Sequence, residues 1–106
     1  MKRIRNEEEA IEHLNEPANA ASYLNGAAAH GDVEMLMICL EKVAKARGMS
    51  KLADKAGLAR GSIYRALQRE SKPHFETIMK IAGALDMNIT FTPRAMPLFD
   101  QDKSTK

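Results

Sequence analysis

The twenty residues from Met49 to Gln68 contain the spacing that most restricts how this chain can fold. Ala53 is followed four residues later by Gly57, and Ile63 comes six residues after the glycine. A small Ala lets two helices approach closely, Gly tolerates the positive φ of a tight turn, and a β-branched residue packs the second helix onto the first. The spacing predicts two short helices joined by a glycine turn. Such a unit can present its second helix to the major groove of DNA.

The composition favours a helical fold with one core. The chain has 106 residues, of which 44% are hydrophobic but only 5% aromatic, and it contains no Trp. A chain of this length can bury a modest core, and that core must come from Leu, Ile, Val, Met and Ala. Because β-branched and aromatic residues are sparse, we expect an all-α fold of five to six helices.

The sequence lacks the features typical of secreted, membrane-spanning and metal-binding proteins. The single cysteine, Cys39, excludes a disulfide within the chain, and there is neither a signal peptide nor a long apolar run. His13, His30 and His74 are scattered, without a second ligand at metal-binding spacing, and no Gly-rich phosphate loop occurs. We therefore expect a soluble cytoplasmic protein that is not an enzyme and has no cofactor, metal or membrane partner.

The charged residues are unevenly distributed, although the net charge is only +2. Residues 1–31 carry three Lys or Arg and five Glu, whereas residues 50–80 carry seven Lys or Arg and three acids. The positive excess thus falls on the segment that the glycine spacing identifies. A basic stripe attracts phosphates, although a solvated charged face also explains a bias of this size.

Apolar periodicity and capping residues predict six helices, over residues 6–15, 17–30, 33–47, 51–56, 60–69 and 75–86. Pro17 suits the first turn of its helix, Asp32 and Ser50 are the expected N-caps of theirs, and Gly48 is expected to end the third. Met37 falls outside the predicted buried stripe. The positions expected to face the core are Leu36, Cys39, Leu40, Val43, Ala44, Leu52, Ala53, Ala56, Ile63, Ala66, Leu67, Phe75, Ile78, Met79, Ala82 and Leu85.

The pattern changes after Asp86. Ile89 to Thr92 alternate apolar and polar residues, which predicts a short C-terminal β-strand over 88–92. A lone strand cannot satisfy its own backbone hydrogen bonds, so we expect it to pair with the same strand of a second subunit in a homodimer. The predicted organisation is one domain over 1–92, with an acidic helical arm (1–31), a helix-turn-helix core (32–86) and the strand. A flexible tail (93–106) follows.

One side of helix 60–69 carries side chains suited to reading DNA. Arg can donate two hydrogen bonds to guanine, Gln can pair with adenine, and small residues at the helix start let the backbone approach the duplex. Lys51 begins the preceding helix, where backbone N–H groups also bind phosphate. The candidate DNA-binding residues are Ser50, Lys51, Arg60, Gly61, Ser62, Tyr64, Arg65, Gln68 and Lys72, and the candidate turn residues are Ala53, Gly57 and Ile63.

Simpler explanations exist for individual residues. Tyr64 could contact a phosphate or a thymine methyl group, or could only pack against the protein. Lys72 and His74 could hold the DNA strand beyond the helix, but Lys72 could equally be solvated and His74 could only cap the next helix. Cys39 lies on an apolar stripe, which favours a core residue over a nucleophile.

Four segments together resemble the addiction-module antidote family, whose members carry a phage-repressor-like (XRE/Cro-type) helix-turn-helix. The segments are AASYLNGAAAHGD (20–32), LEKVAKARGMSKLADKAGL (40–58), SIYRAL (62–67) and KPHFETIMKIAGALDM (72–87), and the similarity extends over about residues 8–92. The most distinctive part is the YLN…GD block before ARGMSKLA, because general repressors of this class lack it. Two residues depart from the pattern: Ala59 stands where many relatives carry Ser or Thr as a helix cap, and His74 stands where relatives often have Ser or Thr.

The resemblance implies the antitoxin of a type II toxin–antitoxin pair. Such proteins bind a small toxin, typically of the RelE/ParE-like superfamily, and repress their own operon by binding its operator as dimers. The DNA-reading helix of the family corresponds to Arg60–Gln68. The missing cap at Ala59 weakens that helix by about 1 kcal/mol without removing a base-reading group.

Two rival functions remain open on the sequence alone. A stand-alone repressor would share every DNA-reading residue, and a pure protein-interaction domain would use the 60–68 face to bind protein. The acidic N-terminal arm favours the antitoxin, because Glu7, Glu8, Glu9, Glu12 and Glu16 would complement a small basic toxin. A solvated charged helix is the alternative explanation for the arm.

Overall fold

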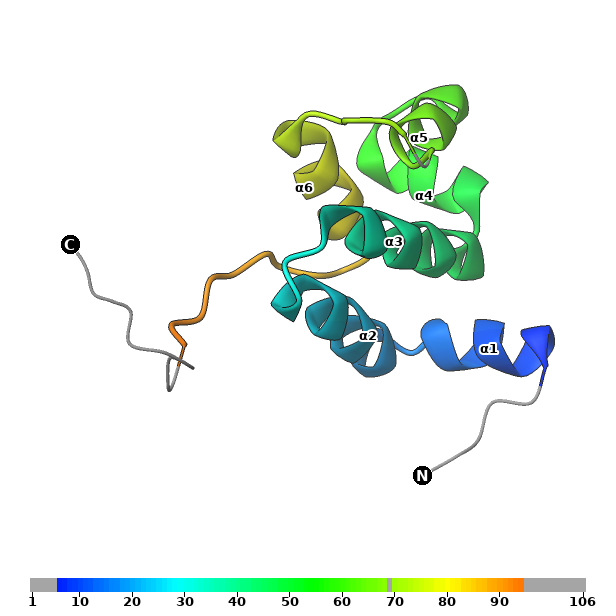
Figure 1. Cartoon of the computed structure of the whole chain (residues 1–106). Helices are drawn as coiled ribbons and strands as arrows, with labels where there is room; N and C mark the ends of the chain where they lie inside the picture. Colours follow the sequence, from blue (N-terminus) through cyan, green and yellow to red (C-terminus); the bar gives the residue numbers. More distant parts are fainter. Residues whose placement is uncertain (1–5, 69, 95–106) are drawn as a thin grey trace.

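A computed structural model describes residues 6–68 and 70–94, and this part of the chain forms six α-helices. They are α1 (Glu7–Leu14), α2 (Pro17–Ala29), α3 (Val33–Arg47), α4 (Met49–Ala56), α5 (Arg60–Ala66) and α6 (Phe75–Ala84). Figure 1 shows α3 between two groups of helices, with α1 and α2 on one side and α4, α5 and α6 on the other. The expected all-α class is thus confirmed for the described residues.

Local signals explain where most of these helices begin. The Asp32 carboxylate accepts a hydrogen bond of 3.2 Å from the Met35 N–H at the start of α3, and Pro17 lies in the first turn of α2. The predicted bounds 33–47 match α3, and the other helices differ from prediction by up to three residues at an end. Helices end where packing and caps stop them, which periodicity alone does not define.

The prediction that Ser50 caps the fourth helix is wrong. Gly48 is the N-cap, with φ 109° and ψ 117°, and α4 already begins at Met49. The Gly48 N–H donates to the Ala44 carbonyl (2.9 Å), and the Gly48 carbonyl accepts from the Leu52 N–H (3.0 Å). One glycine thus ends α3 and starts α4, because it alone can take this positive φ without strain. Ser50 is left inside the first turn of α4.

The core lies where α3, α4, α5 and α6 meet. Its largest fully buried side chains are Val43, Leu52, Ile63, Leu67, Ile81 and Leu85. Two predicted stripes need correction. Met37 is buried while Leu36 is only half-buried, because α3 contacts helices on both sides and its covered face is wide. On α6, Ile81 is fully buried, whereas Phe75 and Met79 are 58% and 50% exposed.

Asp86 ties together the ends of three helices. Its backbone has φ 63°, and the next residue, Met87, donates its N–H to the Ala82 carbonyl (2.9 Å), which closes α6. The Asp86 carboxylate accepts a hydrogen bond from Lys55 Nζ at 3.0 Å and lies 3.6 Å from Arg47 Nη1. The hydrogen bond and charge of Lys55, helped by Arg47, lower the pKa of Asp86. The ends of α3, α4 and α6 are therefore linked electrostatically.

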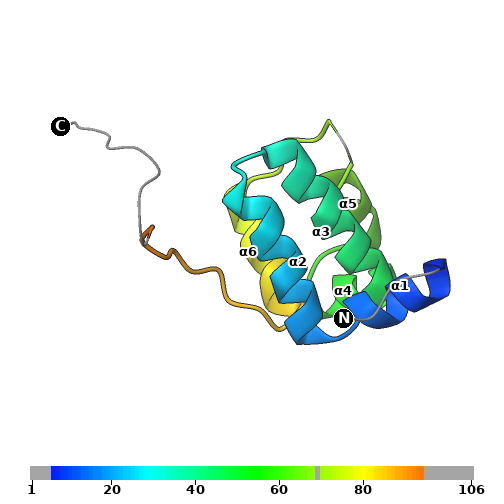
Figure 2. The same cartoon turned by 60° about the horizontal axis from the view of Figure 1, so that its bottom comes forward.

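The predicted strand over 88–92 is not formed within this chain. Residues 87–94 have no regular secondary structure, and Figure 2 shows them as an extended arm that leaves the helical body. A strand needs a hydrogen-bonded neighbour, and a single chain offers the arm none among the described residues. Pairing with a second subunit stays a prediction, as does the flexible tail, which lies outside the described residues from residue 95 onward.

Candidate nucleic-acid interface

The turn between α4 and α5 is built around Gly57. This residue has φ 71° and ψ 31°, in the left-handed region. The N–H of the following residue, Leu58, donates to the Ala53 carbonyl at 3.0 Å, which closes the end of α4. Ala53 is 3% exposed and Ile63 is fully buried, so both lie in the core beside the turn. This arrangement holds α5 across α4 at close range.

The buried side of α5 determines which side chains face outward. Ile63, Ala66 and Leu67 are buried on the core side. Arg60, Gly61, Tyr64, Arg65 and Gln68 are all exposed, and Ser62 is half-buried. The four exposed candidate side chains therefore share one solvent-facing surface with Gly61 and the half-buried Ser62. We call the surface formed by Arg60, Gly61, Ser62, Tyr64, Arg65 and Gln68 the α5 face.

Two weak internal contacts organise the α5 face. The Arg60 guanidinium carbon lies 5.5 Å from the centre of the Tyr64 ring, and Arg60 Nη2 donates to the Tyr64 hydroxyl at 3.4 Å. Arg65 Nη2 donates to Ser62 Oγ at 3.3 Å. An exposed cation–π pair contributes about 0.5–1 kcal/mol, and the hydrogen bond from Arg65 to Ser62 is long. Arg60 can therefore exchange Tyr64, and Arg65 can exchange Ser62, for a ligand. The Tyr64 side chain is 40% exposed, so it packs partly against the protein and remains partly open to a ligand.

The helix reaches less far than its predicted end at residue 69. α5 ends at Ala66, with Leu67 as its C-cap. Gln68 follows in a turn, where its N–H donates to the Arg65 carbonyl at 3.3 Å. Gln68 is therefore an exposed member of the α5 face that lies just outside the helix itself, after the buried C-cap residue Leu67.

Further candidate residues lie outside α5. Ser50 and Lys51 are exposed in the first turn of α4, which has no side-chain cap at its N-terminus. Lys72 is exposed in the irregular segment before α6. His74 occupies the N-cap position of α6 but its side chain makes no capping hydrogen bond.

The cations of this region are electrostatically available. Within the part of the chain that the structure describes, the side-chain ion pairs join Lys45 to Glu41, Lys80 to Glu76, and Arg47 and Lys55 to Asp86. Lys51, Arg60, Arg65 and Lys72 take part in none of them. Exposed cations that form no ion pair with a described acidic residue are suited to phosphate groups, since no carboxylate has to be displaced.

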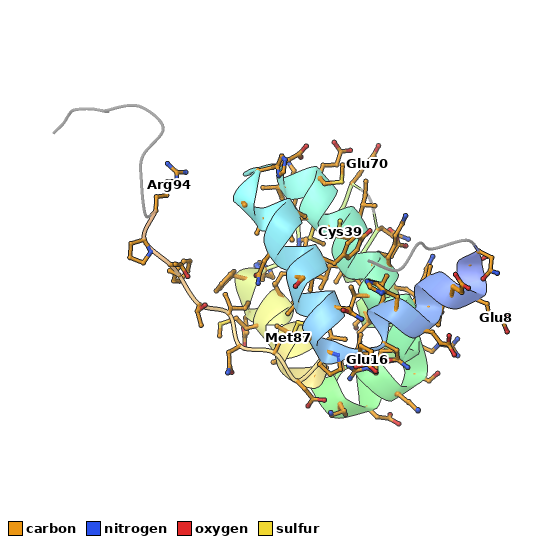
Figure 3. The ribbon with its side chains drawn as sticks, turned by 90° about the horizontal axis from the view of Figure 1, so that it is seen from below. Glu8, Glu16, Cys39, Glu70, Met87 and Arg94 are labelled. Atoms are coloured by element: carbon orange, nitrogen blue, oxygen red, sulfur yellow. The ribbon has the colours of Figure 1, made fainter. Side chains whose placement is uncertain are left out.

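A cluster of acidic residues lies on α1, on the other side of α3 from α4 and α5 (Figure 1). Asn6 caps α1 by accepting a hydrogen bond from the Glu9 N–H at 2.8 Å, and Glu7, Glu8 and Glu12 lie on this helix. Figure 3 shows Glu8 near the outer end of α1 and Glu16 where α1 meets α2. No residue of α1 is fully buried, and the side chains of Glu7, Glu8 and Glu12 are exposed.

The described residues were expected to include neither a metal site nor a reactive cysteine, and two observations concern these expectations. Among the described residues no group of three His, Cys, Asp or Glu side chains could hold a metal ion. Cys39 is buried beside Tyr23, and burial, with help from the Cys39 side chain, raises the pKa of Tyr23 to about 12. The burial of Cys39 and the raised pKa of Tyr23 both describe a packing contact between α2 and α3. None of the described helices has the length and apolarity that a membrane crossing requires.

Comparisons with known proteins identify the family. A family model described as "Probable addiction module antidote protein" matches residues 5–93. A protein of Haemophilus influenzae (strain KW20 / Rd), described as "Uncharacterized protein", is 34% identical over 79 residues, which are 74% of this chain and 81% of the relative. No solved structure matches this chain significantly. Because the family model covers most of the chain, from before α1 to the end of the arm, this protein belongs to the addiction module antidote family.

Proposed function

We propose that this protein is the antitoxin of a type II toxin–antitoxin pair, which binds its toxin and represses its own operon as a cytoplasmic DNA-binding dimer. Membership of the antidote family supports a toxin partner in general. The observation that carries the DNA-binding part is the α5 face, where Arg60 and Arg65 are exposed and pair with no acidic group among the described residues, while Ile63 and Leu67 are buried behind them.

In this proposal α4 and α5 act as an XRE/Cro-like helix-turn-helix. α5 enters the major groove, where Arg65 and Gln68 contact base edges and Arg60 and Tyr64 contact the backbone or bases. Lys51 and Lys72 contact phosphates on either side. Gly61 supports this arrangement because it has no side chain at the start of α5, where the backbone would lie close to the duplex.

A gel-shift assay with the chain's own upstream DNA tests the proposal. Arg65→Ala is expected to weaken operator binding by about 1–3 kcal/mol, since it removes one base contact per subunit. Because Arg65 is exposed and its hydrogen bond to Ser62 is long, the melting temperature should hardly change. Lys45→Ala, on the exposed surface of α3, is the matched control and should bind DNA as the parent does. Equal affinity in both variants would reject the α5 face.

The proposed toxin is a small basic protein of the RelE/ParE-like class. The acidic surface of α1 supports this, because several exposed Glu residues would attract a positively charged partner. Co-expression with a small basic reading frame adjacent to this gene should restore the growth of cells producing the toxin, and the two products should co-purify. The charge-reversal variant Glu8→Lys/Glu12→Lys should weaken that complex and leave DNA binding intact.

A stand-alone repressor without a toxin is the second candidate function. It would use the same α5 face to bind DNA. It would give no role to the acidic surface of α1. Its signature would be operator binding by a chain whose gene has no toxin-like neighbour and whose product co-purifies alone.

A further inference from the structure

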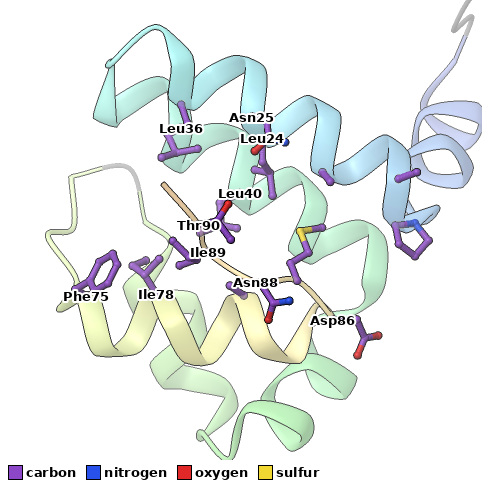
Figure 4. A pocket seen from close by; sticks show the side chains of 16 residues that line it. Leu24, Asn25, Leu36, Leu40, Phe75, Ile78, Asp86, Asn88, Ile89 and Thr90 are labelled. Atoms are coloured by element: carbon purple, nitrogen blue, oxygen red, sulfur yellow. The ribbon is translucent and has the colours of Figure 1, made fainter. Parts of the chain in front are cut away.

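An apolar groove opens on the side of the molecule away from the α5 face. It lies between α2, α3 and α6 and has a volume of about 630 Å³ (Figure 4). Its floor and walls include Leu24, Leu36, Leu40, Phe75, Ile78 and Ala82. A groove of this size and character is comparable to sites that bind ligands or peptide segments. We call it the α2/α6 groove.

The arm that follows α6 begins in this groove and then leaves it. Asn88, Ile89 and Thr90 line the groove, and Ile89 is half-buried there (Figure 4). Beyond Thr90 the arm runs away from the body (Figures 1 and 2), and Phe91 is 90% exposed. In an extended chain residues two apart face the same side, so Ile89 and Phe91 form one apolar face. The first half of that face is covered by the chain's own groove, and the second half is not.

The backbone of the arm is also unpaired. From Asn88 to Arg94 no backbone group forms a hydrogen bond with another described residue. An exposed, extended edge of this kind pairs readily with another strand. Two copies of the same arm are complementary when they run antiparallel about a two-fold axis, because each then donates to and accepts from the other.

We infer that the α2/α6 groove of each subunit receives Phe91 from the arm of a second copy of this chain. The inference rests on the proposed homodimer and specifies how it is made. When the two arms pair antiparallel, each arm extends away from its own helices. Its Phe91 then lies near the open groove of the other subunit. This one exchange covers both the open groove and the exposed Phe91 side chain.

Charge favours a second copy over the toxin as the occupant. Among the described residues that line the groove Asp86 is the only charged one, and its carboxylate is already engaged by Lys55 and Arg47. The arm from Met87 to Pro93 is likewise uncharged. A basic partner would find no acidic complement here, whereas a neutral apolar arm matches a neutral apolar groove.

The first test measures the dimer in the absence of toxin and DNA. Sedimentation equilibrium of Phe91→Ser is expected to show a dimer dissociation constant raised by about 30-fold or more, since a buried aromatic side chain is lost. Met79→Ser removes another exposed apolar side chain, on α6 and outside the groove lining, and should leave the dimer unchanged. Both variants should retain the parent's helical circular dichroism, because neither side chain is in the core.

The second test locates the arm. A Thr92→Cys chain is mixed with a differently tagged Ala28→Cys chain and treated with a short bismaleimide; Cys39 is buried and stays in place. A crosslinked heterodimer is expected, since Ala28 lines the groove. Two results of the first test would overturn the inference: a monomeric parent, or a dimer that is unaffected by Phe91→Ser. A chain that carries both Thr92→Cys and Ala28→Cys gives a third such result if it crosslinks only within itself. Ala28→Trp would also overturn the inference if it abolished toxin co-purification while leaving the dimer intact. Operator binding and growth rescue from the toxin are measured in separate assays. A negative result for the arm exchange therefore does not decide whether the proposed antitoxin function is right.

Discussion

At the scale of single residues, Gly57 has a left-handed backbone conformation that is unfavourable for residues with a Cβ. A Cβ at this position would meet no atom within 4 Å, so the penalty for a side chain comes from the positive φ alone. Gly57→Ala is expected to destabilise the fold by about 1–2 kcal/mol, which lowers the melting temperature by about 4–8 °C per kcal/mol. Gly57→Asn should recover part of the loss, because Asn tolerates this region.

Gly26 provides the matched control for that measurement. It lies inside α2 with an ordinary φ and also has open space around its Cα. Gly26→Ala should therefore raise stability by up to about 1 kcal/mol, through the better helix propensity of Ala. The opposite signs of the two changes are the expected result of a thermal melt, and equal effects would contradict a strained turn at residue 57.

Asp86 makes stability depend on pH at the acid end. Its pKa is lowered in the folded protein, chiefly by the hydrogen bond from Lys55. A carboxylate with a depressed pKa contributes stability above its unfolded value of 3.8, and the contribution is lost as pH falls through the lower folded value. Asp86→Asn should thus be less stable than the parent at neutral pH and should converge with it in acid. Glu76→Gln, which breaks an ion pair within one helix, should show a smaller difference in the same denaturant melts.

At the scale of elements, α5 is a short helix without a capping side chain. Ala59 is its N-cap, with an extended backbone (φ −69°, ψ 145°) that suits a Ser or Thr cap. Ala59→Ser is expected to stabilise the protein by about 1 kcal/mol, because the hydroxyl can accept an unpaired N–H of the first turn. Ala46→Ser, inside α3, should instead lower stability by about 0.5 kcal/mol. If both changes lower the melting temperature, the backbone N–H groups in the first turn of α5 do not need a side-chain cap.

At the scale of the whole molecule, α3 separates two surfaces of opposite charge. α1 lies on one side of α3, and α5 is carried by α4 on the other (Figure 1). Toxin bound at α1 would therefore leave the α5 face open, and a complex of toxin, antitoxin and DNA is expected. Glu8→Lys/Glu12→Lys should lose toxin but bind operator, whereas Arg65→Ala should lose operator but retain toxin. Loss of both activities in either variant, measured by pull-down and gel shift, would show that the surfaces overlap.

The amino-acid sequence determined the local features of this protein. Asp32 and Pro17 begin helices where capping rules predict, and the Ala53–Gly57–Ile63 spacing predicted two helices joined at a left-handed glycine. The alternating residues after Asp86 indicated an extended segment that would need a partner. Each of these depends on interactions between residues that are close along the chain, so the signal is present in the sequence itself.

Only the tertiary structure decided which surfaces are covered. Periodicity assigned Leu36, Phe75 and Met79 to the core, but long-range packing buries Met37 and Ile81 and leaves Phe75 and Met79 exposed. The ion pairs of Asp86 and the groove beside α6 also join residues that are far apart in the chain. The reason is physical: an amphipathic helix specifies that one face is buried, but its neighbours decide how wide that face is and where it stops.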